Sequence, residues 1–385
     1  MINRRHILTV GGASIALVGC GIIAGRALHS DLSAAQRPWK TLGQDLGDPR
    51  LNALAYAILA PNPHNRQPWL VDLGEPGALT LYADLDRLLP ETDPPNRQIV
   101  IGLGAFLEAL RQAAAQQSLR LETTPFPEGE PHPTLDERPV AHVRFIADES
   151  VEADPLFEAI PHRRTARIPF QQDRPVNADT LKQLDTVLRE TDGYFEWVND
   201  VENITSIKEI CKQGWTIEAT TPHTHHESTN LMRFGEKQIN ENPDGISLSG
   251  PFMEATRLAG VMTQEKMEDP NSIAFKGGLD FYNGLIDSAM AFGWLSTDGN
   301  TRIDQLNVGA GWLRLHLAAT QAGLAMHPLS QVLQEFPEMT ELYEDFHDFA
   351  DIRQPARVQG LFRFGYAKAP APSPRWPLET RILSA

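Results

Sequence analysis

The sequence predicts an α+β protein in which two tandem halves form an internal pseudo-dimer, with helices around mixed or antiparallel sheets. Long helix patterns outnumber short strand patterns, and the strands are scattered between the helices. Two of the helices resemble each other at an offset of 207 residues. The length of 385 residues also exceeds the roughly 150 residues of one typical domain.

The composition is that of an ordinary globular protein, with 41% hydrophobic and 22% charged residues. The chain carries 34 basic and 50 acidic side chains, which gives a net charge of −16. A negative field of this size repels phosphate backbones, so we expect no nucleic-acid partner. An anionic ligand would need a local cluster of arginines that acts against the net charge.

Residues 1–25 predict a twin-arginine export signal, because Arg4 and Arg5 precede a weakly apolar stretch. Residues 17–20 (LVGC) resemble a lipobox, which would make Cys20 the lipid-anchored first residue of the mature chain. The alternative is an uncleaved anchor, since residues 7–24 are at the lower limit for a bilayer span. Both place the body on the periplasmic face, with membrane contact only through this anchor. This route exports folded proteins, including proteins that acquire a cofactor inside the cell.

Residues 26–45 are expected to form a linker, and residues 46–150 and 151–385 to form the first and second halves. A stretch at about 200–300 has no counterpart in the first half and predicts a helical insertion of a kind that could cover a site. Alternating or β-branched apolar residues predict strands at 69–73, 79–83, 140–146, 194–198 and 357–366. Helical periodicity predicts helices at 97–119, 178–190, 203–218, 252–268, 278–295 and 303–324.

The internal repeat depends on the first and last of the long helices. At the 207-residue offset, Gly102 and Gly104 fall on Gly309 and Gly311, within an apolar stripe in both copies. Chance similarity between two amphipathic helices is the alternative, but a proline-containing stretch and a strand follow both copies. The glycine pairs lie within helix patterns, so we do not interpret them as a dinucleotide-binding loop.

Residues 161–170 (PHRRTARIPF) contain three arginines and a hydroxyl within five positions. Guanidinium groups and a threonine hydroxyl match the oxygens of a phosphate monoester. A solvated basic turn is the alternative.

Residues 60–69 (APNPHNRQPW) contain three prolines and lead into a predicted strand. The prolines stiffen this loop, while Asn65 and Gln67 present amides that suit the polar edge of a planar heterocycle. The alternative is a structural turn whose amides bond the backbone.

Two later segments add candidates. A turn follows the helix-terminating Gly323, and its backbone can approach a ligand edge at Pro328, Leu329, Ser330 and Gln331. His327 alone is more typical of a packed or surface histidine than of a catalytic one. The proline-rich tail at 370–377 is extended, and its Arg375 could reach a phosphate.

The three histidines at 223, 225 and 226 predict a polar loop rather than a metal site, and we expect no metal. Cys211 lies on the apolar face of a helix pattern and is expected in the core.

Together, residues 60–69, 163–170 and 323–331 resemble the nitroreductase family of FMN flavoproteins, in particular the Acg-like branch with two fused halves. The resemblance covers residues 46–382 and implies a nitroreductase-like fold. It implies that Arg163, Thr165 and Arg167 hold the FMN phosphate, with Arg375 as a late basic contact. It also implies that Asn65 and Gln67 meet the flavin or its ribityl chain, and that the turn 328–331 lies beside the flavin ring. The loop lacks the usual serines, and Arg375-Trp376 replaces a basic pair.

Each motif occurs once, in opposite halves, so we expect a monomer that binds one FMN per chain. The resemblance implies a flavin-dependent oxidoreductase that passes hydride or electrons through N5 to an acceptor. No side chain is assigned as a catalytic acid or nucleophile. The alternative is a non-enzymatic FMN-binding or FMN-sequestering protein with a covered site. The electron donor and the substrate stay open, because NAD(P)H is a cytoplasmic reductant; a quinol or a small redox protein could replace it.

Overall fold

The computed structural model describes residues 31–383 except 189, 190 and 192. The expected export signal, with Arg4, Arg5 and Cys20, lies outside the described residues. Within the described part of the chain, no helix has both the length and the apolar character needed to cross a membrane.

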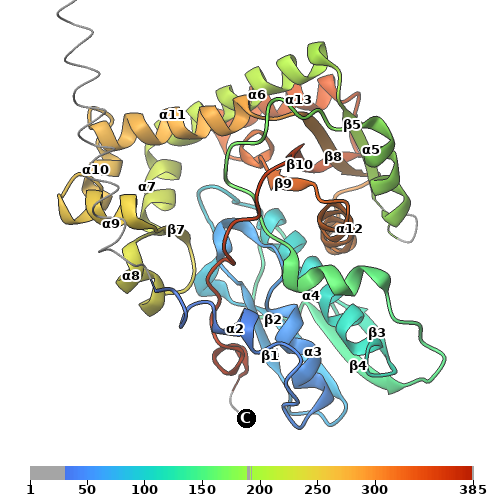
Figure 1. Cartoon of the computed structure of the whole chain (residues 1–385). Helices are drawn as coiled ribbons and strands as arrows, with labels where there is room; N and C mark the ends of the chain where they lie inside the picture. Colours follow the sequence, from blue (N-terminus) through green and yellow to red (C-terminus); the bar gives the residue numbers. More distant parts are fainter. Residues whose placement is uncertain (1–30, 189–190, 192, 384–385) are drawn as a thin grey trace, which may run out of the picture.

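Two four-stranded antiparallel sheets have the same topology (Figure 1). Sheet A has the order β1-β2-β4-β3 and sheet B the order β5-β8-β10-β9, so each strand of one has a counterpart in the other. Counted along the chain, the second and third strands of each sheet are connected by a long helix. This arrangement confirms the predicted α+β class with two tandem halves, whereas the exact limits of the halves stay a prediction.

The first half consists of α3 (Pro49–Ala57), β1 (Trp69–Asp72), β2 (Ala78–Ala83), α4 (Arg97–Ala115), β3 (Leu119–Pro125) and β4 (Ala141–Ala147). The second half consists of α5 (Ala178–Asp185), β5 (Tyr194–Val198), β8 (Ala291–Thr297), α12 (Arg302–Gln321), β9 (Ala325–Pro328), α13 (Thr340–Phe349) and β10 (Arg357–Gly365). The short helix α2 (Arg37–Lys40) precedes both.

Helices α4 and α12 cross in direct backbone contact between the two sheets. A Cβ atom at Gly104 would lie 2.0 Å from the carbonyl oxygen of Leu306, and one at Gly309 would lie 2.1 Å from that of Ile101. These contacts are reciprocal at an offset of 205 residues, which also aligns the first residues of the helices, Arg97 and Arg302. The expected offset of 207 is therefore wrong by two residues.

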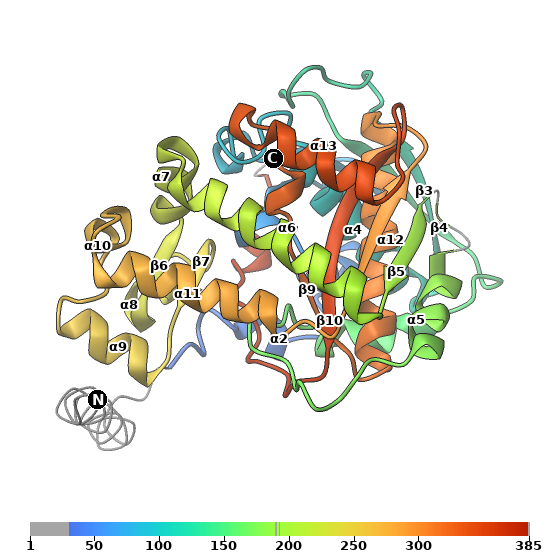
Figure 2. The same ribbon diagram turned by 90° about the horizontal axis from the view of Figure 1, so that it is seen from above.

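The main core is continuous between the halves. It combines buried side chains of α4, α12 and both sheets. A second cluster lies on the other face of sheet B, where α6 and α13 cover β8 and β10 (Figures 1 and 2). Cys211 is buried in this second cluster, as expected, and burial raises the pKa of its thiol.

The insertion replaces a hairpin turn. Residues 73–77 join β1 to β2, whereas residues 199–290 join the equivalent strands β5 and β8. The insertion holds α6 (Val201–Thr220), α7 (Pro222–Asn230), β6 (Met232–Phe234), α8 (Gly235–Glu241), β7 (Ile246–Leu248), α9 (Pro251–Leu258), α10 (Gln264–Glu268) and α11 (Ile273–Asp287). Helices α6 and α11 run side by side over the body, and α7–α10 form a separate lobe (Figure 2).

Candidate functional site

The loop at residues 60–69 has an unusual backbone. His64, Asn65 and Gln67 have φ angles of 46°, 52° and 52°, a left-handed conformation that side chains other than glycine rarely adopt. The Asn62 Oδ1 atom accepts a hydrogen bond of 2.7 Å from the Gln67 backbone N–H and so closes the loop. Such strain persists only where surrounding contacts fix the conformation.

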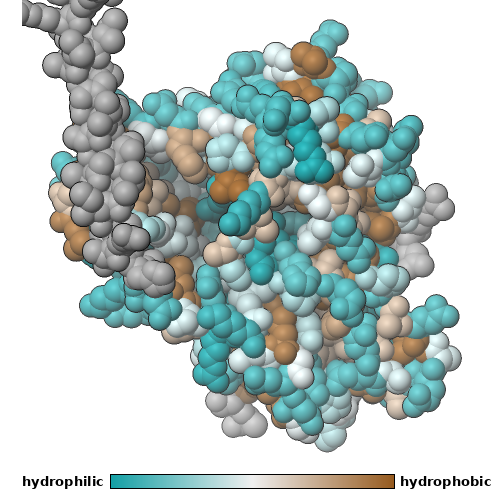
Figure 3. Space-filling view, viewed as in Figure 1, coloured by the Kyte–Doolittle hydropathy of each residue, from teal (hydrophilic) through white to brown (hydrophobic). Residues whose placement is uncertain are grey.

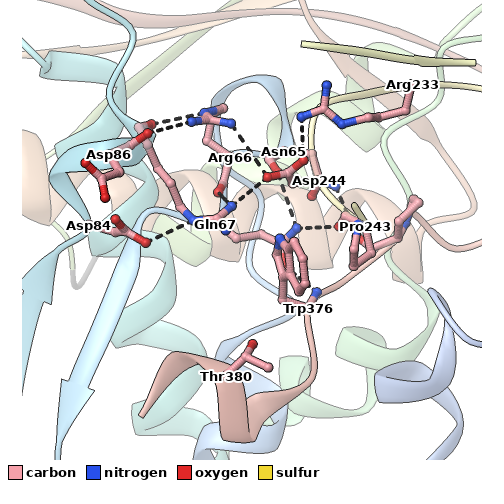
Figure 4. A network of polar contacts seen from close by, with 12 residues as sticks. Asn65, Arg66, Gln67, Asp84, Asp86, Arg233, Pro243, Asp244, Trp376 and Thr380 are labelled. Carbon is pink, nitrogen blue, oxygen red and sulfur yellow. Dashed lines mark hydrogen bonds and ion pairs between the residues drawn. The ribbon is translucent and has the colours of Figure 1, made fainter. Parts of the chain in front are cut away.

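The Asn65 and Gln67 amides supply those contacts. Asn65 Nδ2 donates to the Pro374 carbonyl at 3.0 Å, and Asn65 Oδ1 accepts from Arg375. Gln67 Nε2 donates to the Pro243 carbonyl at 2.8 Å, and Gln67 Oε1 accepts from the Trp376 backbone N–H at 2.8 Å (Figure 4). The two amides therefore join the first half to the tail and the insertion, and their contact with a cofactor stays a prediction.

The arginine segment runs beside the edge strand of sheet B. Thr165 forms a parallel bridge with Met326 of β9, and the Ala166 backbone N–H donates to the Met326 carbonyl at 3.0 Å. Arg163 is 3% exposed, and its guanidinium donates to the Leu59 carbonyl at 2.9 Å. Arg164 lies over the Trp39 ring, 4.6 Å from its centre.

The arginine segment and the tail, both in the second half, thus meet at Leu59 of the first half, directly before the proline loop. Arg375 is 2% exposed and donates to the Leu59 carbonyl at 3.2 Å, beside the Arg163 contact. It also donates to the Ile58 and Ala60 carbonyls, so protein oxygens already occupy its guanidinium. We call Arg163, Arg164 and Arg375 the arginine cluster.

No carboxylate of the described residues pairs with the arginine cluster. Burial, together with the neighbouring Arg164, lowers the pKa of Arg163 to about 9. Burial and the charges of Arg163 and Arg164 also lower the pKa of Arg375. Three uncompensated cations in a protein of net charge −16 would be stabilised by an anion at this place.

Arg167 is the arginine of this segment whose side chain is open to a ligand. It is exposed, and its guanidinium forms no hydrogen bond or ion pair with the described residues. Burial and the charge of Arg167 lower the pKa of His64 to about 4, and burial with the charges of Arg363 and Arg167 lowers the pKa of His327 well below its usual value. His64 Nδ1 is buried and has no hydrogen-bond partner in the described part of the chain. The Thr165 hydroxyl also has no partner there.

The turn after β9 presents backbone donors. Leu329 N–H donates to the Leu361 carbonyl at 2.8 Å, which continues the pairing with β10. The backbone N–H groups of Ser330 and Gln331 have no acceptor among the described residues. His327 is buried and accepts from Arg363 Nε at 2.9 Å, so its role is structural, as expected.

Residues of the insertion that no sequence motif marks also lie on this turn. Tyr282 of α11 accepts a hydrogen bond of 3.1 Å from Gln331 Nε2, and its ring stacks on Trp215 of α6 at 4.4 Å. Arg167 also influences the pKa of Tyr282, which burial raises to about 12. The insertion therefore supplies one aromatic wall of the site.

Glu218 of α6 is a buried carboxyl group close to the same turn. It is 2% exposed, accepts from Ser228 Oγ at 3.1 Å, and burial raises its pKa to about 7. An unfolded glutamate has a pKa of about 4.3. Between about pH 4 and pH 7 the Glu218 carboxyl group is therefore protonated in the folded chain and mostly ionised in the unfolded chain. Stability therefore falls as the pH rises from about 4 to about 7.

Replacing Glu218 with glutamine is expected to reverse this loss. The variant should be as stable as the parent near pH 4 and more stable by up to about 3 kcal/mol near pH 8, because it has no carboxyl group to ionise. Urea unfolding of both chains at the two pH values measures the difference. An equal difference at both values would contradict the shifted pKa.

The insertion is attached to the first half through Asp244. Arg87 and Arg233 contact this carboxylate at 2.7 Å and 2.9 Å, and Arg66 lies at 3.6 Å (Figure 4). Burial opposes ionisation, but the three guanidinium groups hold the pKa of Asp244 below its usual value. Removing this carboxylate would leave three cations without their shared partner.

The three histidines of the insertion lie on α7, where a polar loop was expected. His223 contacts Glu91 at 2.8 Å, His226 contacts Glu268 at 3.1 Å, and His225 bonds the Met267 carbonyl at 2.8 Å. They have separate partners, and the described residues contain no group of side chains suited to a metal ion.

Comparison with known proteins gives several relatives of similar length, and no family model matches the chain. A Mycobacterium tuberculosis protein named "putative NAD(P)H nitroreductase acg" is 28% identical over 346 residues, which cover 85% of this chain and 93% of that protein. An uncharacterized protein of the same organism is 27% identical over 86% of this chain and 91% of its own length.

Solved structures match less closely. The FMN-dependent nitroreductase NfnB of Mycobacterium smegmatis, solved with NADPH, is 16% identical over 58% of this chain and 94% of its own, with a TM-score of 0.35. The FMN- and NADPH-dependent NfnB of a Sphingopyxis strain is 15% identical over 59% of this chain and 97% of its own, with a TM-score of 0.36.

Proposed function

We propose that this chain binds FMN between its two halves and acts as an oxidoreductase of the nitroreductase type. The observation that carries the proposal is the arginine cluster, which has no carboxylate partner in the described residues and lies where the two halves meet. Similarity to a relative named as a nitroreductase, over most of both chains, supports the same conclusion.

The residues present fit FMN. Its phosphate would accept hydrogen bonds from the Arg167 guanidinium and the Thr165 hydroxyl, neither of which has a hydrogen-bond partner among the described residues, next to the charge of Arg163. Arg375, Asn65 and Gln67 would hold the tail against the loop and so shape the wall of the site. Their amides and guanidinium would have to exchange a present partner before they could contact the ligand.

Bound FMN supplies hydride transfer at N5. The chain's own contribution would be to orient the ring and to stabilise negative charge on it, through the free backbone N–H groups of Ser330 and Gln331. Tyr282 and Trp215 would exclude water from one side.

One FMN per chain is the expected stoichiometry. At the corrected offset of 205 residues, His316 beside Arg163 corresponds to Arg111 in the first half. Arg111 and Arg314 pair with Glu108 and Asp154 in a balanced group of four charges, which leaves no uncompensated cation for a second phosphate. Release of the flavin from purified full-length protein by denaturation, with a protein assay, measures the ratio. A ratio of two would contradict the proposal.

The alternative is an FMN-sequestering protein. One observation supports it: the insertion is attached to the first half at Asp244, and the same insertion places Tyr282 on the turn at residues 328–331. Stopped-flow mixing with NADH, NADPH or a water-soluble quinol is expected to bleach the flavin absorbance of the parent with at least one donor. Bleaching confined to Asp244→Asn would instead support sequestration. Asp173→Asn changes an exposed carboxylate away from this network and serves as the control.

The proposed location is the periplasmic face, reached by the twin-arginine route, with lipid anchoring through Cys20 and a monomeric body. Support comes only from residues 1–25 of the sequence. Radiolabelled palmitate should enter the parent chain and not Cys20→Ser.

A further inference from the structure

The lobe of the insertion and the adjoining helix α11 carry several exposed apolar side chains. Five of the eleven large apolar side chains that are exposed in the described residues lie within residues 252–281. We call them the apolar edge: Phe252 (63% exposed), Leu258 (63%), Val261 (44%), Ile273 (83%) and Phe281 (57%). They belong to α9, α11 and the segment between them, and Figure 3 shows apolar surface on the outer margin of this lobe. Exposure of this many large apolar groups in one segment is typical of an interaction surface.

The chain enters the described structure at the same lobe. Asp31 N–H donates to Glu236 of α8 at 2.9 Å, and Asn240 of α8 donates to the Asp31 carbonyl at 2.8 Å. Helix α8 in turn contacts α9, because the Glu236 backbone N–H donates to Glu254 at 2.5 Å. The described part of the chain therefore begins at α8, which contacts the helix α9 that carries Phe252 and Leu258.

We propose that the apolar edge rests in the interfacial layer of a lipid bilayer, next to the N-terminal anchor. If Cys20 carries the lipid, ten residues separate it from Asp31, and they span at most about 35 Å. The lobe is then the part of the body held nearest to the membrane. This inference depends on the predicted anchor and not on the proposed FMN chemistry, so either can fail without the other.

Charge indicates how the contact is made. Residues 250–282 contain three basic and five acidic side chains, a net charge of −2. Attraction to anionic headgroups is therefore excluded as the driving force, and apolar burial remains. We expect the contact to resist high salt.

Docking would also bring the candidate site close to the bilayer. Helix α11 begins at the exposed Ile273, and its Tyr282 bonds Gln331 in the turn predicted to lie beside the flavin ring. Nine residues of helix correspond to about 14 Å. A lipid-soluble quinol would then have a short route to the site, which favours this class of donor.

The test uses the full-length protein in vesicles of phosphatidylethanolamine and phosphatidylglycerol that carry a photoactivatable diazirine on the acyl chain. After illumination, mass spectrometry maps the cross-linked residues. We expect cross-links within 252–281, at low and high salt alike. The exposed apolar residues Tyr194 and Val201, outside the lobe, are internal controls and should not react.

A triple variant, Phe252→Ser, Leu258→Ser and Ile273→Ser, is expected to lower cross-linking of the segment by about tenfold or more, since each large apolar side chain contributes to burial. These side chains are exposed, so thermal unfolding should match that of the parent. Cross-links confined to residues 1–30, or equal at Tyr194 and Val201, would overturn the proposal. The proposal would also be overturned if the apolar edge were buried in the absence of lipid. The covering group could be the N-terminal segment or a second copy of the chain, and sedimentation would reveal the second copy.

Discussion

Replacing Gly104 with alanine is expected to destabilise the folded chain by about 3 kcal/mol or more. The new Cβ would lie 2.0 Å from the Leu306 carbonyl oxygen and less than 3 Å from two further backbone atoms of that residue. Backbone of a helix cannot move aside as a flexible side chain can, so α4 and α12 would have to separate. Urea unfolding followed by circular dichroism measures the effect.

Gly284→Ala is the matched control. Gly284 also lies within a helix, α11, but a Cβ there would meet nothing within 4 Å. This change should leave stability unaltered or raise it by up to about 1 kcal/mol, because alanine favours the helix. Equal behaviour of the two variants would show that the crossing does not depend on glycine.

Replacing Arg163 and Arg167 together with alanine is expected to abolish FMN retention during purification. Loss of the Arg167 contact to the phosphate, together with loss of the neighbouring Arg163 charge, should weaken binding roughly 100-fold or more. The flavin absorbance of the purified protein and a fluorescence titration with FMN measure retention and affinity.

The single variant Arg167→Ala separates binding from folding. Arg163 is buried and bonds the Leu59 carbonyl, so its loss can also disturb the fold, whereas Arg167 is exposed and its side chain forms no hydrogen bond or ion pair with the described residues. We expect Arg167→Ala to weaken FMN binding about tenfold with unchanged thermal stability. Arg353→Ala, at a surface site paired with Asp348, should change neither. Unaltered FMN affinity of Arg167→Ala would refute the phosphate assignment.

Much of the fold could be predicted from the sequence, since all five expected strands exist. The helix expected at 278–295 is wrong at its end, because residues 291–297 form β8. Every residue of β8 is buried, so its apolar run has no alternation that would distinguish a strand from a buried helix. The helix expected at 252–268 is two helices, α9 and α10, interrupted at Gly260, where φ is 67°.

The predicted offset of 207 residues between the two repeated helices was wrong for a reason that lies in their packing. Both glycine pairs were assigned to the same role, but only one glycine of each helix lies at the crossing. A Cβ on Gly102 would instead meet Asn62, and one on Gly311 would meet Leu188 and Thr191. A sequence shows that a small residue is present, but not which neighbour requires it.

The candidate site could be predicted in part. The two predicted arginines Arg163 and Arg375 meet at Leu59, directly before the proline loop. The partners of Asn65 and Gln67 in the tail and the insertion could not be foreseen, because residues 176 to 310 positions away supply them. Tyr282, Trp215 and Glu218 were missed because they lie in the insertion, where no motif marks them.

The long connection between β5 and β8 has a consequence for how the molecule assembles. Closing 92 residues rather than five before two neighbouring strands pair costs about 2–3 kcal/mol of additional chain entropy. Sheet A, with its local pairings, should therefore form well before sheet B, and high contact order should make the second event slow. Until sheet B forms, the apolar face of α4 is not covered by α12, and such a partly folded chain is prone to aggregation. We therefore expect a chaperone to aid folding of the newly synthesised chain until α12 packs on α4.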